Sequence, residues 1–152
     1  MAHPIDPSIL AAANISPRTG LATDYLNHFN EVAMLIGMLT DMPEAAEDVI
    51  AWQACSYGEH FRRSGFRDRD LAIEAFELIE PPTRQAFQDA LQHAESAVRD
   101  VQARLIEGMD PAKFCADCAA DLYEKIAALD AVITGNAAHA DEGQAAVDAL
   151  FD

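Results

Sequence analysis

Two long stretches of the chain, together covering about residues 82–134, repeat apolar residues at alternating spacings of four and three. In the first stretch these positions are Phe87, Leu91, Ala94, Val98, Val101 and Leu105. In the second they are Cys115, Cys118, Leu122, Ile126, Leu129 and Ile133. Such spacing places the apolar side chains on one face of a helix, and Gly108 and Pro111 between the stretches favour a short connection. The pattern therefore predicts a long antiparallel αα-hairpin.

Shorter helical patterns precede this hairpin. One extends from about Asp24 to Leu39, and a second follows Pro43 and is expected to falter near Cys55. Helical segments are also expected over residues 56–63 and 68–80, the latter ending at a Pro-Pro pair. The chain is therefore predicted to be all-α, a helical bundle in which two or three shorter helices pack across the hairpin.

The first 20 residues differ from the rest. They contain three prolines and Gly20, which interrupt any long helix, and leave room for one short turn capped by Asp6. We expect residues 1–20 to form an N-terminal arm that docks on its own domain or on a partner subunit, and residues 21–152 to form a single helical domain. Residues 141–151 are expected to form a final short helix.

Composition narrows the classes of function. The chain has 152 residues, 51% of them hydrophobic, and a net charge of −16, which fits one soluble domain with its own core. Excess negative charge disfavours direct binding to nucleic acid or to anionic membranes, and no apolar run reaches transmembrane length. A long hairpin leaves apolar surface that another chain could cover, so we expect a homodimer or a protein partner.

The three cysteines, Cys55, Cys115 and Cys118, form an odd set in a chain without an export signal. This combination predicts reduced thiols and a cytoplasmic location. Cys115 and Cys118 fall on the apolar stripe, so we interpret them as core residues and not as a redox pair. The preference for arginine over lysine, with abundant alanine, is typical of a GC-rich bacterial genome.

One group of residues has the chemistry of a metal site. His28 and Glu31 are three residues apart on one predicted helix, and Glu59 and His60 lie on another. If these helices pack together, two imidazoles and two carboxylates would suit a divalent transition metal. The alternative is that the histidines are packing residues with hydrogen-bonded rings, while the glutamates are solvated.

Two further sets of residues could bind ligands. Trp52 and Tyr57 lie near the expected helix break, where they could line a pocket, and Asn27 on the preceding helix is a further candidate for binding a small ligand. Four arginines, which could attract an anion or pair with the protein's own carboxylates, fall within eight positions. They are Arg62, Arg63, Arg67 and Arg69.

The sequence contains no pattern that identifies a reaction, and no cofactor is firmly implied. We therefore expect a non-catalytic helical protein that acts through protein contacts, by self-association or as an adaptor. The alternative is a helical bundle that binds a metal or a small ligand. Its site would lie between the helix that carries His28 and Glu31 and the helix that carries Glu59 and His60.

Overall fold

The computed structural model describes residues 3–113 and 116–135, and every regular element in these ranges is a helix. The α-helices are α1 (Pro7–Ala12), α2 (Asn27–Met38), α3 (Ala46–Ala51), α4 (Tyr57–Arg63), α5 (Arg69–Glu77), α6 (Pro81–Ile106) and α7 (Ala116–Thr134). Three short 3-10 helices accompany them: η1 (Thr23–Leu26), η2 (Pro43–Ala45) and η3 (Pro111–Lys113). The predicted all-α class is confirmed, while the helix expected over residues 141–151 lies outside the described residues.

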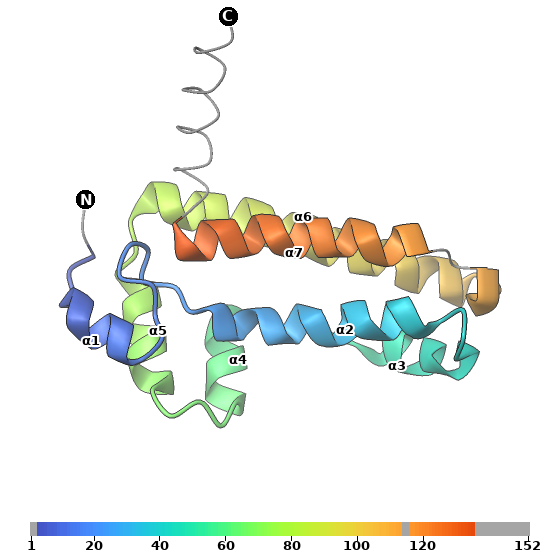
Figure 1. Cartoon of the computed structure of the whole chain (residues 1–152), viewed down its shortest axis with the longest axis horizontal. Helices are drawn as coiled ribbons and strands as arrows, with labels where there is room; N and C mark the ends of the chain where they lie inside the picture. The colour runs from blue at the N-terminus through green and yellow to red at the C-terminus, as the bar shows by residue number, and fades with distance from the viewer. Residues whose placement is uncertain (1–2, 114–115, 136–152) are drawn as a thin grey trace, which may run out of the picture.

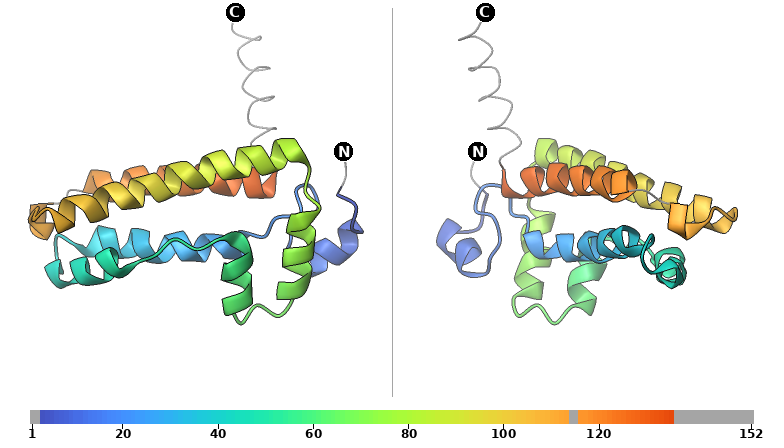
Figure 2. Two further views of the ribbon diagram at one scale, coloured as in Figure 1. Left: turned by 180° about the vertical axis from the view of Figure 1, so that it is seen from behind. Right: turned by 45° about the vertical axis from the view of Figure 1, so that its right-hand side comes forward.

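The helices form two layers. The long helices α6 and α7 lie side by side and run in opposite directions (Figure 1). α2 packs against α7, and α3 packs against both α2 and α6, which completes the second layer (Figure 2). α4 and α5 form a short pair that projects from the bundle beside the start of α2 (Figure 1).

The apolar stripes of α6 and α7 face the core. On α6, the repeated positions are buried except for Leu91, which is half-buried. On α7, the buried positions of the predicted stripe are Leu122, Ile126, Leu129 and Ile133. Cys118 is half-buried, and Cys115 lies outside the described residues.

Small residues bring α2 and α7 close together. A Cβ atom placed on Gly37 would lie 3.8 Å from the Cβ of Ala119, which is ordinary van der Waals contact. The helix axes can approach each other this closely because neither residue carries a larger side chain at the crossing. Phe29, Val32 and Ile36 of α2 are therefore buried against the long helices.

Residues 3–20 are fastened to the same bundle. Leu10 and Ile15 are fully buried, and the hydroxyl of Thr19 donates a hydrogen bond to the carbonyl of Ile133 in α7. The ring of His3 accepts from the N–H of Ile5 through Nδ1 at 3.1 Å, so its Nε2 donates to the carbonyl of Ala75 at 2.8 Å. These bonds reach α5 and α7, so the segment packs on its own chain.

The helical pattern between residues 43 and 63 is broken. α3 ends at Ala51, and Trp52 adopts an extended backbone with φ −61° and ψ 135°. α4 begins after Ser56, whose Oγ accepts a hydrogen bond from the N–H of Glu59 at 3.1 Å, as expected of an N-cap residue. The extended residues 52–56 carry the chain across the side of α2, where the candidate site residues meet.

Candidate functional site

Aromatic rings and imidazoles from six segments converge where η1, α2, residues 52–56, α4 and α5 come together against α6. We call this group the aromatic cluster. Its members are Tyr25, His28, Phe29, Trp52, Tyr57, His60, Phe61, Phe76 and Phe87. Neighbouring ring centroids lie 4.6–6.4 Å apart, in the range in which rings interact favourably.

His28 is held in its neutral form by its surroundings. Its ring stacks on the indole of Trp52 at a centroid distance of 4.6 Å, and its Nε2 accepts a hydrogen bond from the N–H of Cys55 at 3.2 Å. Burial, with a smaller contribution from the nearby His60, lowers the pKa of His28 to about 4. The neutral ring therefore carries its proton on Nδ1 near pH 7.

His60 lies next to His28 but has a different partner. The two ring centroids are 6.4 Å apart, and the Nε2 of His60 lies 3.0 Å from the Oδ2 of Asp24. Asp24 belongs to η1, which leads directly into α2, so the turn before the helix that carries His28 positions the carboxylate beside His60.

The two predicted glutamates do not join this pair. Glu31 is exposed on α2, and Glu59 is exposed on α4, where it lies 3.8 Å from the guanidinium of Arg63. Across residues 3–113 and 116–135, no three side chains of histidine, cysteine, aspartate or glutamate are arranged to hold a metal ion. The structure thus brings together His28 and His60, while the two carboxylates predicted to complete the set point to solvent.

Trp52 is held in place through both its indole N–H and its backbone carbonyl. Its Nε1 donates to the carbonyl of His28 at 3.1 Å. Its own carbonyl accepts from the side-chain amide of Gln102 at 2.8 Å, and the same amide donates to the carbonyl of Val49 at 2.9 Å. Gln102 of α6 therefore holds the end of α3 and the start of the extended segment in place.

The two buried tyrosines act as structural hydrogen-bonding groups. The hydroxyl of Tyr57 accepts from the N–H of Ala22 at 2.8 Å, and the hydroxyl of Tyr25 donates to the carbonyl of Cys55 at 2.8 Å. Burial raises the pKa of both phenols above its usual value. Burial likewise raises the pKa of the Cys55 thiol, so near pH 7 all three groups are protonated.

Of the three candidate ligand-binding residues, Asn27 lines a different part of the structure from Trp52 and Tyr57. Its side chain donates to the Oδ1 of Asp24 at 3.3 Å and lines an open hollow of about 630 Å³. The other walls of this hollow include Ile15, Phe66 and Thr134. Trp52 and Tyr57 are instead packed within the aromatic cluster.

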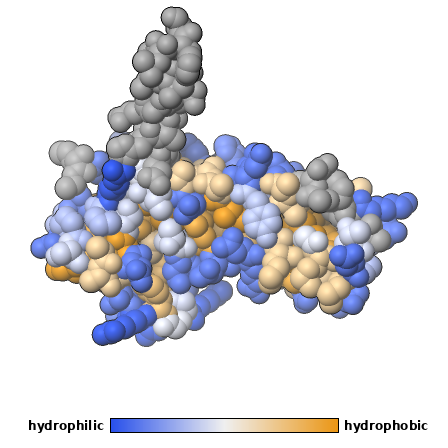
Figure 3. Space-filling model, viewed as in Figure 1, coloured by the Kyte–Doolittle hydropathy of each residue, from blue (hydrophilic) through white to orange (hydrophobic). Residues whose placement is uncertain are grey.

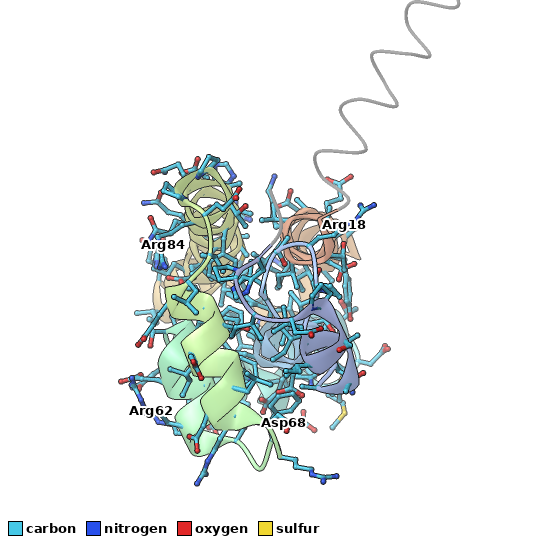
Figure 4. All side chains as sticks on the ribbon, turned by 90° about the vertical axis from the view of Figure 1, so that its left-hand side faces the viewer. Arg18, Arg62, Asp68 and Arg84 are labelled. Carbon is cyan, nitrogen blue, oxygen red and sulfur yellow. The ribbon has the colours of Figure 1, made fainter. Side chains whose placement is uncertain are left out.

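The four arginines lie around the connection between α4 and α5, and all of them are exposed. Arg62 lies on the outer face of α4 (Figure 4), where its guanidinium passes over Gly58. Arg63 approaches Glu59 at 3.8 Å, which is a weak, exposed ion pair. Asp68, at the N-cap of α5, forms no side-chain cap. Because all four arginines are exposed, the connection is basic and open to solvent.

Sequence reasoning missed Asp24, Tyr25, Cys55 and Gln102 as members of this region. Of these, only Asp24 could have been found from the sequence, because it precedes His28 by one helical turn. The other three are identified by contacts with residues at least 27 positions away.

No helix among the described residues is long and apolar enough to cross a membrane. Comparisons with protein-family models, with curated proteins and with solved structures gave no significant match.

Proposed function

We propose that this protein is non-catalytic and acts through protein contacts, by self-association or as an adaptor. The observation that carries the proposal is a set of large apolar side chains left exposed at one end of the bundle. We call this surface the apolar end. It consists of Met34, Met42, Ile50, Ile106 and Met109.

These side chains come from segments that end near one another. Met34 lies on α2, Met42 precedes η2, Ile50 lies on α3, and Ile106 and Met109 lie where α6 ends (Figure 1). Ile106 is 68% exposed and Met34 is 56% exposed. Figure 3 shows apolar surface over the C-terminal half of α2 and its neighbourhood.

Burial against another protein would stabilise such a surface. Fully burying a side chain of this size contributes roughly 1.5–3 kcal/mol, so a few of them can support an interface. Methionines also adapt their shape to different partners, because their side chains are unbranched and flexible. A single exposed apolar side chain is common on protein surfaces, but five of them on adjoining segments favour a surface that contacts another protein.

The internal partners of the candidate site residues support a structural interpretation of the aromatic cluster. The Nε2 of His28, the indole N–H of Trp52 and the hydroxyl of Tyr57 all bond to the protein's own backbone. Groups engaged in this way stabilise the junction between helices, and the contact surface then lies elsewhere.

Sedimentation velocity over a range of protein concentrations tests self-association. The informative variant is Met109→Lys in the apolar end, with Leu78→Lys at the end of α5 as its control, because the two residues are 44% and 43% exposed. We expect the wild-type chain and Leu78→Lys to associate and Met109→Lys to remain monomeric. Equal association of both variants would contradict the assignment of the surface.

The adaptor form of the proposal needs a second measurement. Cross-linking from a cysteine introduced at Ile106 should capture a partner that a cysteine introduced at Leu78 does not. A monomeric protein that also captures nothing from Ile106 would contradict the whole proposal.

The second candidate function is binding of a metal or a small ligand beside His28 and His60. It is favoured by the approach of the two rings to 6.4 Å and by the carboxylate of Asp24 beside His60. Metal content of the untagged wild-type protein, compared with that of the variant His28→Ala/His60→Ala, tests it. Near-stoichiometric metal that disappears in the variant would support this candidate.

A further inference from the structure

Two surfaces of opposite charge lie on different parts of the molecule. We call the exposed set Arg62, Arg63, Arg67 and Arg69, around the connection of α4 and α5, the arginine turn. We call the exposed set Asp41, Glu44, Glu47 and Asp48, from the end of α2 to α3, the acidic strip. Residues 19–61 contain no lysine or arginine, so no basic residue interrupts the acidic strip along the chain.

Within residues 3–113 and 116–135, most of these charges have no ionic partner. Among the described residues, Arg63 is the only member of either surface in an ion pair, and its partner Glu59 is 3.8 Å away. Asp68 and Asp70 lie within or beside the arginine turn, and Arg104 and Lys113 lie at the same end of the bundle as the acidic strip. Each surface nevertheless keeps an excess of one sign.

The positions of the two surfaces separate them in a single copy. The acidic strip lies at the end of the bundle where α2 turns into α3, whereas the arginine turn projects from its side near the opposite end (Figures 1 and 2). Figure 4 shows Arg62 on the outside of this projection. One copy therefore presents both halves of a complementary pair without joining them.

We propose that the arginine turn of one copy binds the acidic strip of a second copy, in a head-to-tail contact. This inference rests on the self-associating form of the proposed function and specifies its geometry. Arginine suits the role because its guanidinium can bind a carboxylate through two parallel hydrogen bonds.

Apolar residues adjoin both charged surfaces. Met42 and Ile50 of the apolar end are interspersed with the acidic strip and are 42% and 40% exposed. Phe66 is half-buried within the arginine turn, where its ring packs on Phe61. The contact can thus combine apolar burial with charge pairing, the usual division between the centre and the rim of an interface.

The net charge of −16 does not prevent such a contact. At physiological ionic strength, charges more than about 8 Å apart are largely screened, so the local pairing of opposite signs outweighs repulsion between distant carboxylates. Complementary patches of this kind mainly determine the orientation and the rate of association.

A head-to-tail contact has a consequence that a two-fold symmetric contact lacks. Each copy that donates its arginine turn still has a free acidic strip, so association continues into a longer assembly unless a ring closes. Sedimentation velocity of the wild-type chain should therefore show species larger than a dimer as concentration rises.

Two charge-reversed variants test the proposal. Arg67→Glu/Arg69→Glu removes the basic half, and Asp41→Lys/Glu44→Lys removes the acidic half, while each keeps the other half intact. Asp100→Lys/Glu124→Lys, on the exposed faces of α6 and α7, is the matched control for the second variant. Circular dichroism and urea unfolding first establish that all three variants are folded.

We expect each variant alone to self-associate at least about tenfold more weakly than the wild-type chain and the control. An equimolar mixture of the two variants should form a 1:1 dimer that does not grow, because only one functional interface is restored. The chain carrying all four substitutions should remain monomeric, because each of its two surfaces then holds two charges of each sign.

Three outcomes overturn the proposal, and they are distinguishable from failure of the proposed function. If both variants associate as the wild-type chain does, the contact lies elsewhere, and Met109→Lys decides whether the apolar end forms it. If each variant is monomeric and their mixture is too, the head-to-tail geometry is wrong. If the wild-type chain is monomeric, this contact does not exist, and the adaptor form is decided by the cross-linking experiment.

Discussion

The indole of Trp52 and the imidazole of His28 stack at a centroid distance of 4.6 Å, and the indole N–H also donates to the carbonyl of His28 at 3.1 Å. The two residues are thus joined through both ring and backbone, although 24 positions separate them. This contact holds the extended segment after α3 against the side of α2. The protonation of His28 therefore reports on the packing between α2 and this segment, because burial there lowers the pKa of its imidazole.

The stability of the fold should fall on acidification through the titration of His28. Its pKa is about 4 in the folded chain and about 6.5 when unfolded, so the unfolded state binds more protons between these values. The free energy of unfolding therefore decreases as the pH falls from about 6.5 towards 4, and no further contribution arises above pH 6.5.

Urea unfolding at a series of pH values measures this dependence. His28→Gln removes the titrating group, so the profile of the variant should be flatter than that of the wild-type chain. His93→Gln, at an exposed position on α6, is the control and should leave the slope in this range unchanged. An unchanged slope in His28→Gln would show that His28 is solvated in solution.

Removing the hydroxyl of Tyr57 should destabilise the fold. In Tyr57→Phe, the N–H of Ala22 loses its acceptor while it remains buried, and an unsatisfied buried group of this kind costs about 1–3 kcal/mol. Tyr123→Phe is the matched control, because Tyr123 is 48% exposed on α7 and should change stability by less than about 0.5 kcal/mol. Chemical denaturation of both variants provides the comparison.

Gln102 should be the glutamine of α6 on which stability depends most. Gln102→Ala leaves the carbonyls of Val49 and Trp52 without their side-chain donor at the end of α3, which we expect to cost about 1–2 kcal/mol. Gln92→Ala, at an exposed position on the same helix, should be nearly neutral. Thermal unfolding followed by circular dichroism distinguishes them, and equal midpoints would contradict the assigned role.

Two glycines should respond in opposite ways to replacement by alanine. Gly37→Ala should stabilise the chain by about 0.5–1 kcal/mol, because the new methyl group fits against Ala119 and alanine favours the helix. Gly20→Ala should destabilise it by more than about 1 kcal/mol, since Gly20 has φ +80° and its Cβ would overlap the ring of His3. Urea unfolding of the two variants should therefore move the midpoint in opposite directions.

Much of the fold could be predicted from the sequence because its signals are local. The apolar stripe of α6 and the capping role of Ser56 follow from residues within a few positions of one another. The break after α3 was also expected, though nearer Cys55 than Trp52. At this break the carbonyl of Trp52 accepts a hydrogen bond from Gln102, which is 50 residues further along the chain and gives no local signal.

The candidate site was only partly predictable for the same reason. His28 and His60 were expected to meet if their helices packed together, and their ring centroids lie 6.4 Å apart. Glu31 was placed with them from helical spacing, yet the ring of His28 turns towards Trp52 and Cys55 while Glu31 stays in solvent. A spacing of three residues shows that two side chains share a face of a helix, but packing decides which of them is covered.

By itself, the sequence determined the helical class, the apolar seams of the long helices and the concentration of arginines between residues 62 and 69. Only the tertiary structure decided that Asp24 orients His60, that Gln102 holds the end of α3, and that the acidic strip lies apart from the arginine turn. Helix formation depends on neighbours within a few positions. The contacts between helices are selected by shape and by hydrogen bonding across the whole core, which a local pattern does not contain.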